Sequence, residues 1–190
     1  MDVPRKPALS RRFVDNVTRG GGVILYFRDH FVVKKIDVVI RLKSFEYACL
    51  SISTPRGPVT VVVIYRPGSL EPDATFLQEF SSLLEVLATF NSRFVIGGDL
   101  NIHFEDQTNN AVVQVNQILS SFALTQHVVL PTHNRGGILD VIITDRTVAS
   151  LIFGSILRLS PTMVQFSVRY HSLFLLHLSL PLDRFVAGKS

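Results

Sequence analysis

Residues 93–103 read RFVIGGDLNIH, and this stretch indicates both the fold class and the candidate site. Phe94–Gly97 is a short apolar run that predicts a buried strand, and glycine precedes Asp99 directly. Glycine permits the tight turn that would present a carboxylate and the amide of Asn101 together at the rim of a sheet. The carboxylate could then activate water or bind a cation, and the amide could donate to a phosphoryl oxygen. Alone, the pattern is a weak indication of catalysis and is more often a turn in which both side chains satisfy nearby backbone groups.

The patterns on both sides of this stretch predict an α/β protein with a large sheet component. Spaced apolar residues in Pro72–Phe90, with Asp73 as N-cap, predict an amphipathic helix. Four short runs separated by charged or Pro/Gly turns predict an antiparallel meander: Gly22–Arg28, Ile36–Leu42, Glu46–Ser53 and Val59–Tyr65. Downstream we expect a helix over 111–122 and four further apolar segments: His127–Leu130, Leu139–Thr144, Leu151–Leu159 and Ser172–Leu180.

Composition predicts one globular domain without a membrane segment. The chain has 190 residues, 47% of them hydrophobic, and enough apolar material for a core. No stretch reaches the roughly 18 apolar residues that a spanning helix requires. The single Cys49 lies in an alternating apolar run and indicates a reduced thiol in a cytosolic or nuclear protein. The basic N-terminus lacks the apolar segment of a secretory signal, so we do not expect secretion.

Positive charge is concentrated at the N-terminus. Residues 1–43 contain ten Lys and Arg against four Asp and Glu, whereas residues 44–190 contain nine against eleven. Such an arm suits the phosphates of a nucleic acid. The alternative is a solvated leader, and we expect residues 1–19 to be a basic, disordered one.

Further polar residues are expected where the predicted strands end. Tyr65, Arg66, Asp140 and His171 suit a phosphodiester site together with Asp99, because they supply donors, a base and an Asp-oriented imidazole. The predicted catalytic residues are Asp99, Asn101, Asp140 and His171, and the predicted substrate-binding residues are Tyr65, Arg66 and His133. Arg66 and Arg135 could equally be surface residues without a phosphate contact. Glu46 fits a solvated strand start slightly better than a site carboxylate.

Five motifs in order resemble the endonuclease/exonuclease/phosphatase family. They are Gly20–Val23, Ile64–Pro67, Ile96–His103, Gln126–His133 and Leu139–Thr144. More narrowly, the series is similar to the apurinic-type endonuclease domain of non-LTR retrotransposons. The similarity extends over roughly residues 20–180.

This resemblance implies a four-layered α/β/β/α sandwich with largely antiparallel sheets and Mg²⁺-dependent hydrolysis of DNA. In the family, the residue at Asp99 activates water, and those at Asn101 and Tyr65 contact the phosphate. The residue at Asp140 supports the histidine at His171. The resemblance also implies a reverse transcriptase as partner in the parent element.

Two departures from the family pattern predict an impaired enzyme. We expect the sandwich to be incomplete, because residues 1–20 lack the apolar runs of the family's opening strand-helix-strand segment, which carries a metal-binding Glu. Tyr170 stands where the final motif has Asp, so Asp99 would be a weak and incomplete metal site. The expected organisation is a leader over 1–19, the domain over 20–182 and a tail over 183–190. Without the opening segment, we also expect strand Phe94–Gly97 to present unpaired backbone.

Two other interpretations stay open at this point. The scaffold could serve as a noncatalytic module that binds nucleic acid or protein through its basic arm. The chain could also be an unstable relic with no selected function.

Overall fold

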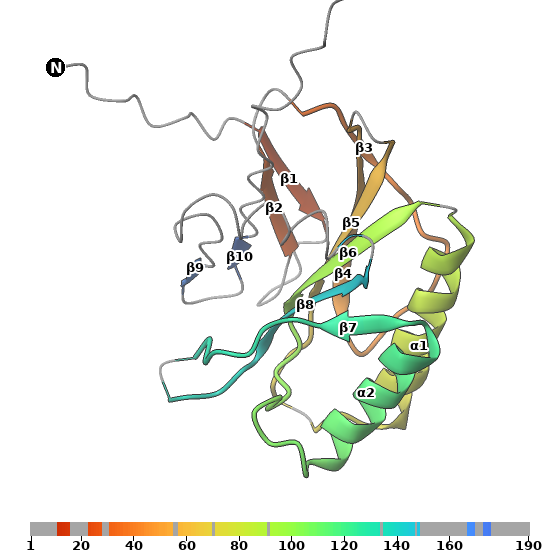
Figure 1. The fold of residues 1–190 in the computed structure, drawn as a ribbon. Helices are drawn as coiled ribbons and strands as arrows, with labels where there is room; N and C mark the ends of the chain where they lie inside the picture. The colour runs from red at the N-terminus through yellow and green to blue at the C-terminus, as the bar shows by residue number, and fades with distance from the viewer. Residues whose placement is uncertain are drawn as a thin grey trace, which may run out of the picture.

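A six-stranded sheet with helices on one face forms the centre of the computed structural model (Figure 1). The structure describes residues 11–15, 23–27, 31–54, 57–69, 71–90, 92–133, 135–146, 148, 167–169 and 173–175. Its elements are β1 (Arg11–Asp15), β2 (Val23–Phe27), β3 (Val33–Lys35), β4 (Glu46–Ile52), β5 (Val59–Tyr65), α1 (Ala74–Thr89), β6 (Arg93–Asp99), α2 (Asn110–Ser121), β7 (Leu124–Gln126), β8 (Asp140–Asp145), β9 (Ser167–Arg169) and β10 (Leu173–Leu175).

The strand order in this sheet is β3-β4-β5-β6-β8-β7. Strands β5 and β6 are parallel, and the other neighbouring pairs of the sheet are antiparallel. A parallel pair requires a crossover connection, and α1 supplies it between β5 and β6. The sheet is mixed and mostly antiparallel, and it is not closed.

Both predicted helices are confirmed, and each begins at a side-chain cap. Asp73 accepts a hydrogen bond from the Phe76 amide at 2.9 Å, and Asn109 accepts one from the Ala111 amide at 2.9 Å. These contacts satisfy amides that have no partner within the helix. The buried face of α1 consists of Phe76, Phe80, Leu83, Leu84 and Leu87. It packs with α2 and one face of the sheet into the larger core.

The opposite face of the sheet carries a second apolar cluster. Ala48, Leu50, Val61 and Val63 alternate along β4 and β5 with the residues that face the helices, and Val23 of β2 packs on them. Strand β2 pairs with β1 and lies against β4 and β5, while β10 pairs with β9 and lies beside β2 (Figure 1). Helices, sheet and these strand pairs form successive layers, which confirms the predicted α/β class.

One predicted strand, Ile36–Leu42, is wrong. The ladder with β4 covers Val33–Lys35, and Ile36 adds one hydrogen bond to the Cys49 carbonyl at 2.9 Å. Beyond it Val38 is buried and Val39 is 98% exposed, and the Val38 carbonyl accepts a hydrogen bond from the Tyr47 hydroxyl. The alternation therefore reflects an irregular extended segment that covers the core edge.

Two further expectations also differ from the structure. Strand β1 lies inside the predicted leader, because residues 11–15 pair with β2; residues 1–10 and 16–19 lie outside the described residues. Strand β6 has no unpaired edge, since β5 and β8 bond to its two sides. Segment 151–159 lies outside the described residues, and within 172–180 the structure describes only β10. Among the described residues, neither helix could span a lipid bilayer.

Candidate functional site

Four polar residues form one row across the sheet. Glu46 on β4 is directly opposite Tyr65 on β5, Tyr65 is opposite Asp99 on β6, and Asp99 is opposite Asp140 on β8. Residues at the same register position project to the same face, and neighbouring strands are about 4.8 Å apart. The row lies on the face that carries Ala48 and Val63, away from the helices. Below, this set is called the site row.

A tight turn follows Asp99 and places Asn101 beside it. The Asn101 amide donates to Asp99 Oδ1 at 2.8 Å, and Asn101 has a left-handed φ of 48°, which asparagine tolerates better than most residues. The Asn101 side chain donates through Nδ2 to the Arg66 carbonyl at 2.7 Å. Gly68 leaves room for that carboxamide, because an added Cβ would lie 2.8 Å from Asn101 Oδ1. Asp99 and Asn101 therefore make the hydrogen bonds to nearby backbone groups that are expected of a polar turn, and they also lie within the site.

Arg66 is buried beneath this turn, with an exposed fraction of 3%. Its Nε donates to the Leu100 carbonyl at 2.6 Å, and one terminal nitrogen donates to the Asn101 carbonyl at 2.8 Å. The guanidinium carbon lies 5.5 Å from the centre of the Phe76 ring. Burial contradicts the surface interpretation of Arg66, and the guanidinium braces the backbone of the turn.

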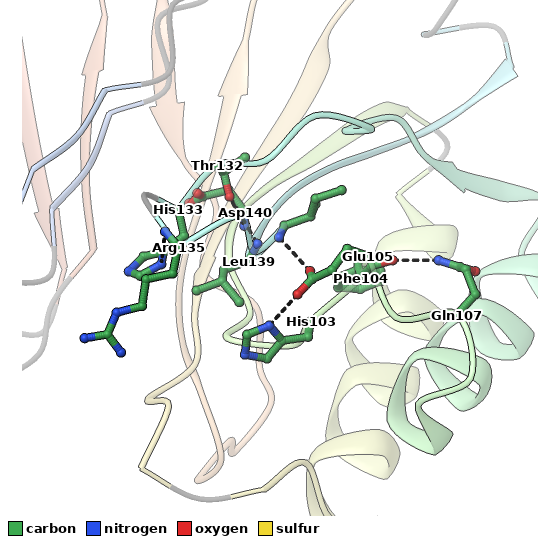
Figure 2. Close-up of polar contacts among 10 residues, drawn as sticks. His103, Phe104, Glu105, Gln107, Thr132, His133, Arg135, Leu139 and Asp140 are labelled. Carbon is green, nitrogen blue, oxygen red and sulfur yellow. Dashed lines mark hydrogen bonds and ion pairs between the residues drawn. The ribbon is translucent and has the colours of Figure 1, made fainter.

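Asp140 is held at the start of β8 by the loop before it (Figure 2). The Thr132 hydroxyl oxygen accepts hydrogen bonds from the Leu139 and Asp140 amides, both at 3.1 Å. Asp140 is buried, and its Oδ1 has no hydrogen-bond partner. His133 and Arg135 are exposed on the same loop, and the Arg135 amide donates to His133 Nδ1 at 3.3 Å.

Burial raises the pKa of both aspartates above its ordinary value. It raises the pKa of Asp99 to about 6, the Asp140 charge adds to this rise, and the Asn101 hydrogen bond and the Arg66 charge oppose it. Burial likewise raises the pKa of Asp140, against the opposing effects of Thr132 and His133. A carboxyl group that titrates near neutral pH can exchange a proton with water during a reaction.

We predict that this raised pKa makes stability decrease with pH. The ordinary pKa of 3.8 lies below the folded value of about 6, so the folded protein binds more protons between these values than the unfolded chain. The contribution of Asp99 to the free energy of unfolding is therefore present at about pH 4 and is lost as pH rises through about 6. The loss amounts to at most roughly 3 kcal/mol. Urea melts in EDTA at about pH 4 and about pH 8 measure this loss. Asp99→Asn should reduce it, and exposed Asp37→Asn should leave it unchanged; equal slopes in all three proteins would contradict the prediction.

The sequence profile of the Endonuclease/Exonuclease/phosphatase family matches residues 4–156. This chain belongs to that family. Among solved structures, this Endonuclease/Exonuclease/phosphatase domain is similar to the "Endonuclease domain of TRAS1, a telomere-specific non-LTR retrotransposon". That match has a TM-score of 0.57 and 16% identity over 74% of this chain and 67% of the other. The resemblance inferred from the motifs is confirmed, and the structural likeness shows a shared fold.

Two toxin structures give weaker matches to this family member. Beta toxin from Staphylococcus aureus has a TM-score of 0.37 at 15% identity, over 53% of this chain and 42% of the toxin. The Haemophilus ducreyi cytolethal distending toxin has a TM-score of 0.36 at 14% identity, over 75% of this chain and 64% of the other. No curated protein matches the chain.

The domain brings together most of the residues that the sequence singled out. Tyr65, Asp99 and Asp140 are neighbours in the site row, and Asn101 is bonded to Asp99. His133 is close enough to Asp140 for its charge to lower the pKa of that carboxyl. The predicted partner of Asp140, His171, lies outside the described residues, as does Tyr170.

Glu46 lies closer to the site than its sequence pattern indicated. The residue heads β4 in the site row, and its Oε2 is buried without a hydrogen-bond partner. This placement fits a site carboxylate better than the solvated strand start that the sequence slightly favoured. The signal was its position at the head of a strand whose antiparallel neighbour ends at Tyr65, but register is not readable from one strand alone.

Two neighbouring carboxylates of this domain, Asp99 and Asp140, are suitable ligands for a divalent cation. Mg²⁺ binds through one or two carboxylates together with phosphate oxygens. The neighbours Asp99 and Asp140 offer two, and the unpartnered Asp140 Oδ1 suits a cationic partner. Among the described residues, no group of three or more His, Cys, Asp or Glu side chains is arranged to hold a metal ion. The pair therefore fits as part of a cation site that also needs the substrate's oxygens.

Proposed function

We propose that this chain is a DNA-binding domain of the endonuclease type, with the site row at the scissile phosphodiester and with impaired hydrolysis. The observation that carries the proposal is the register that places Tyr65, Asp99 and Asp140 side by side at the ends of three adjacent strands. Family membership supports phosphodiester or phosphoester chemistry at such a row. The motif resemblance to the endonuclease domain of non-LTR retrotransposons supports DNA as substrate and a reverse transcriptase in the parent element.

Each residue of the proposed site has a distinct role. Asp99, with a pKa of about 6, accepts a proton from the attacking water near neutral pH. The phenol of Tyr65 and the second amide hydrogen of Asn101 donate to phosphoryl oxygens, where charge develops. Asp140 orients the imidazole of His171. We propose a positioning role for Arg66 in place of a substrate contact, because the guanidinium is buried and donates to two carbonyls of the turn.

A divalent cation, when bound by Asp99 and Asp140, would neutralise charge on the phosphate. Impairment is supported by Tyr170, a neutral phenol where the family pattern has a carboxylate. Loss of a single preorganised charge-stabilising group costs about 100-fold to 1,000-fold in rate. We therefore expect DNA binding to persist while turnover is nearly lost.

A nicking assay on supercoiled plasmid, with Mg²⁺ or Mn²⁺ and the full 190-residue chain, tests this proposal. We expect nicking no faster than that of Asp99→Asn, and DNA binding whose affinity falls steeply with salt. Rapid nicking that Asp99→Ala abolishes and Asp37→Ala leaves intact would refute the impairment. Failure to bind DNA at low salt would refute the proposed substrate.

A further inference from the structure

The side chain of Glu105, in the loop after β6, contacts the segment Gly137–Leu139 that leads into β8. Below, the contacts of Glu105 with Ile138 and His103 are called the clasp, and residues 137–139 are called the arm. Glu105 Oε2 accepts a hydrogen bond from the Ile138 amide at 2.7 Å, and Oε1 lies 2.6 Å from His103 Nδ1 (Figure 2). The His103 side chain is 63% exposed and that of Glu105 is 36% exposed. The clasp therefore lies on the surface, outside the site row.

The arm has other fixed contacts on both of its edges. On one side, the Leu100 amide donates to the Leu139 carbonyl at 3.0 Å, and the Phe104 amide donates to the Ile138 carbonyl at 3.1 Å. On the other side, Thr132 binds the amides of Leu139 and Asp140. These bonds give partners to the carbonyls of Ile138 and Leu139 and to the amide of Leu139. The amide of Ile138 has Glu105 as its hydrogen-bond acceptor.

The same arm closes the loop that carries the exposed site residues. The amides of Thr132 and His133 both donate to the Gly137 carbonyl at 2.9 Å, one residue before the clasp. Gly137 packs closely against the clasp, because an added Cβ would lie 3.3 Å from His103 Nδ1. Movement of the arm at Ile138 would therefore move the anchor of Thr132 and His133.

We propose that Glu105 is a positioning residue that holds the 131–140 loop, and with it Thr132 and His133, in place for substrate. The proposal rests on the proposed function for what the loop does, while the clasp itself stands on the contacts above. Ile138 is buried, with an exposed fraction of 7%, and the Glu105 carboxylate is the acceptor of its amide hydrogen. The hydrogen bond from Ile138 is the largest cause that lowers the pKa of Glu105, so this carboxyl group is ionised at neutral pH.

Hydrogen exchange and DNA affinity of Glu105→Ala test the inference. Loss of a charge-assisted hydrogen bond should speed exchange of the Ile138 amide by about tenfold and shift the amide resonances of Thr132 and His133. DNA affinity should fall by roughly threefold to tenfold. Glu105→Gln keeps one acceptor oxygen and should recover part of both effects. Exposed Glu85→Ala on α1 removes a carboxylate elsewhere and should change neither.

Three results would overturn the inference. Unchanged exchange at Ile138 in Glu105→Ala would show that the clasp does not protect the arm. Faster exchange with the DNA affinity of the Glu85→Ala control would show that the arm does not position the site. Absence of DNA binding by the wild-type chain would refute the proposed function but not the clasp. Amide resonances of Thr132 and His133 that do not shift in Glu105→Ala would refute the clasp, whether or not the chain binds DNA. If Glu105→Ala does not fold, the same criteria apply to Glu105→Gln.

Discussion

Gly98→Ala is expected to prevent stable folding of the chain. Gly98 lies in β6 with a φ of +148°, and a Cβ at this position would lie 1.8 Å from the Ile64 carbonyl oxygen on β5. That atom belongs to the backbone of a central strand, so a rotamer change cannot relieve the clash. We expect a loss above about 5 kcal/mol, comparable with the whole stability of a small domain. Soluble yield and a urea melt of the purified chain measure it.

Gly136→Ala is the matched control, because it separates backbone strain from the clash. Gly136 also has a positive φ, +89°, but among the described residues no atom beyond its two chain neighbours lies within 4 Å of the Cβ position. Its replacement should cost about 1–2 kcal/mol, the usual penalty of a left-handed conformation. A cooperative melt for Gly98→Ala within about 1 kcal/mol of the Gly136→Ala melt would contradict the described packing of β5 and β6.

Arg66→Ala should give the second largest loss, about 3 kcal/mol or more. It removes the donors of the Leu100 and Asn101 carbonyls and leaves a space against Phe76. Arg66→Lys should recover only part of this stability, because one ammonium group cannot reproduce the planar fork. Urea melts of both variants measure the loss. Exposed Arg146→Ala is the control, with an expected change within about 0.5 kcal/mol.

The pKa of Asp99 shows whether Arg66 acts on the site or only contributes packing to the core. The Arg66 charge lowers this pKa in the wild type, so its removal should raise the value above about 6. An NMR titration of the Asp99 carboxyl in Arg66→Ala would show the rise if the variant folds, and Arg66→Lys should show a smaller one. An unchanged pKa in Arg66→Ala, together with a loss below about 1 kcal/mol, would contradict the assigned role.

Much of the fold could be predicted because local patterns agree with the final packing. The apolar spacing and cap of α1 and the β-branched run of β5 are preferences of neighbouring residues, and each appears as expected. Ile36–Leu42 shows the limit of such patterns. Alternating apolar and polar residues indicate which side chains are buried. They do not indicate whether a neighbouring strand is available for hydrogen bonding, and here the ladder with β4 ends near Ile36.

Local sequence by itself determined the turn chemistry of the candidate site. Asp99 and Asn101 encode a carboxylate acceptor and a left-handed position through an interaction two residues apart, whereas the close approach of Ile64 to Gly98 comes from the neighbouring strand. The family motifs also placed Tyr65 and Asp140 in the same site. Tertiary structure decided the rest, because strand register and burial arise from segments distant in sequence. Only the folded sheet aligns Glu46 with the row, buries Arg66 beneath the turn, and raises the pKa of Asp99 by removing water from its carboxyl group.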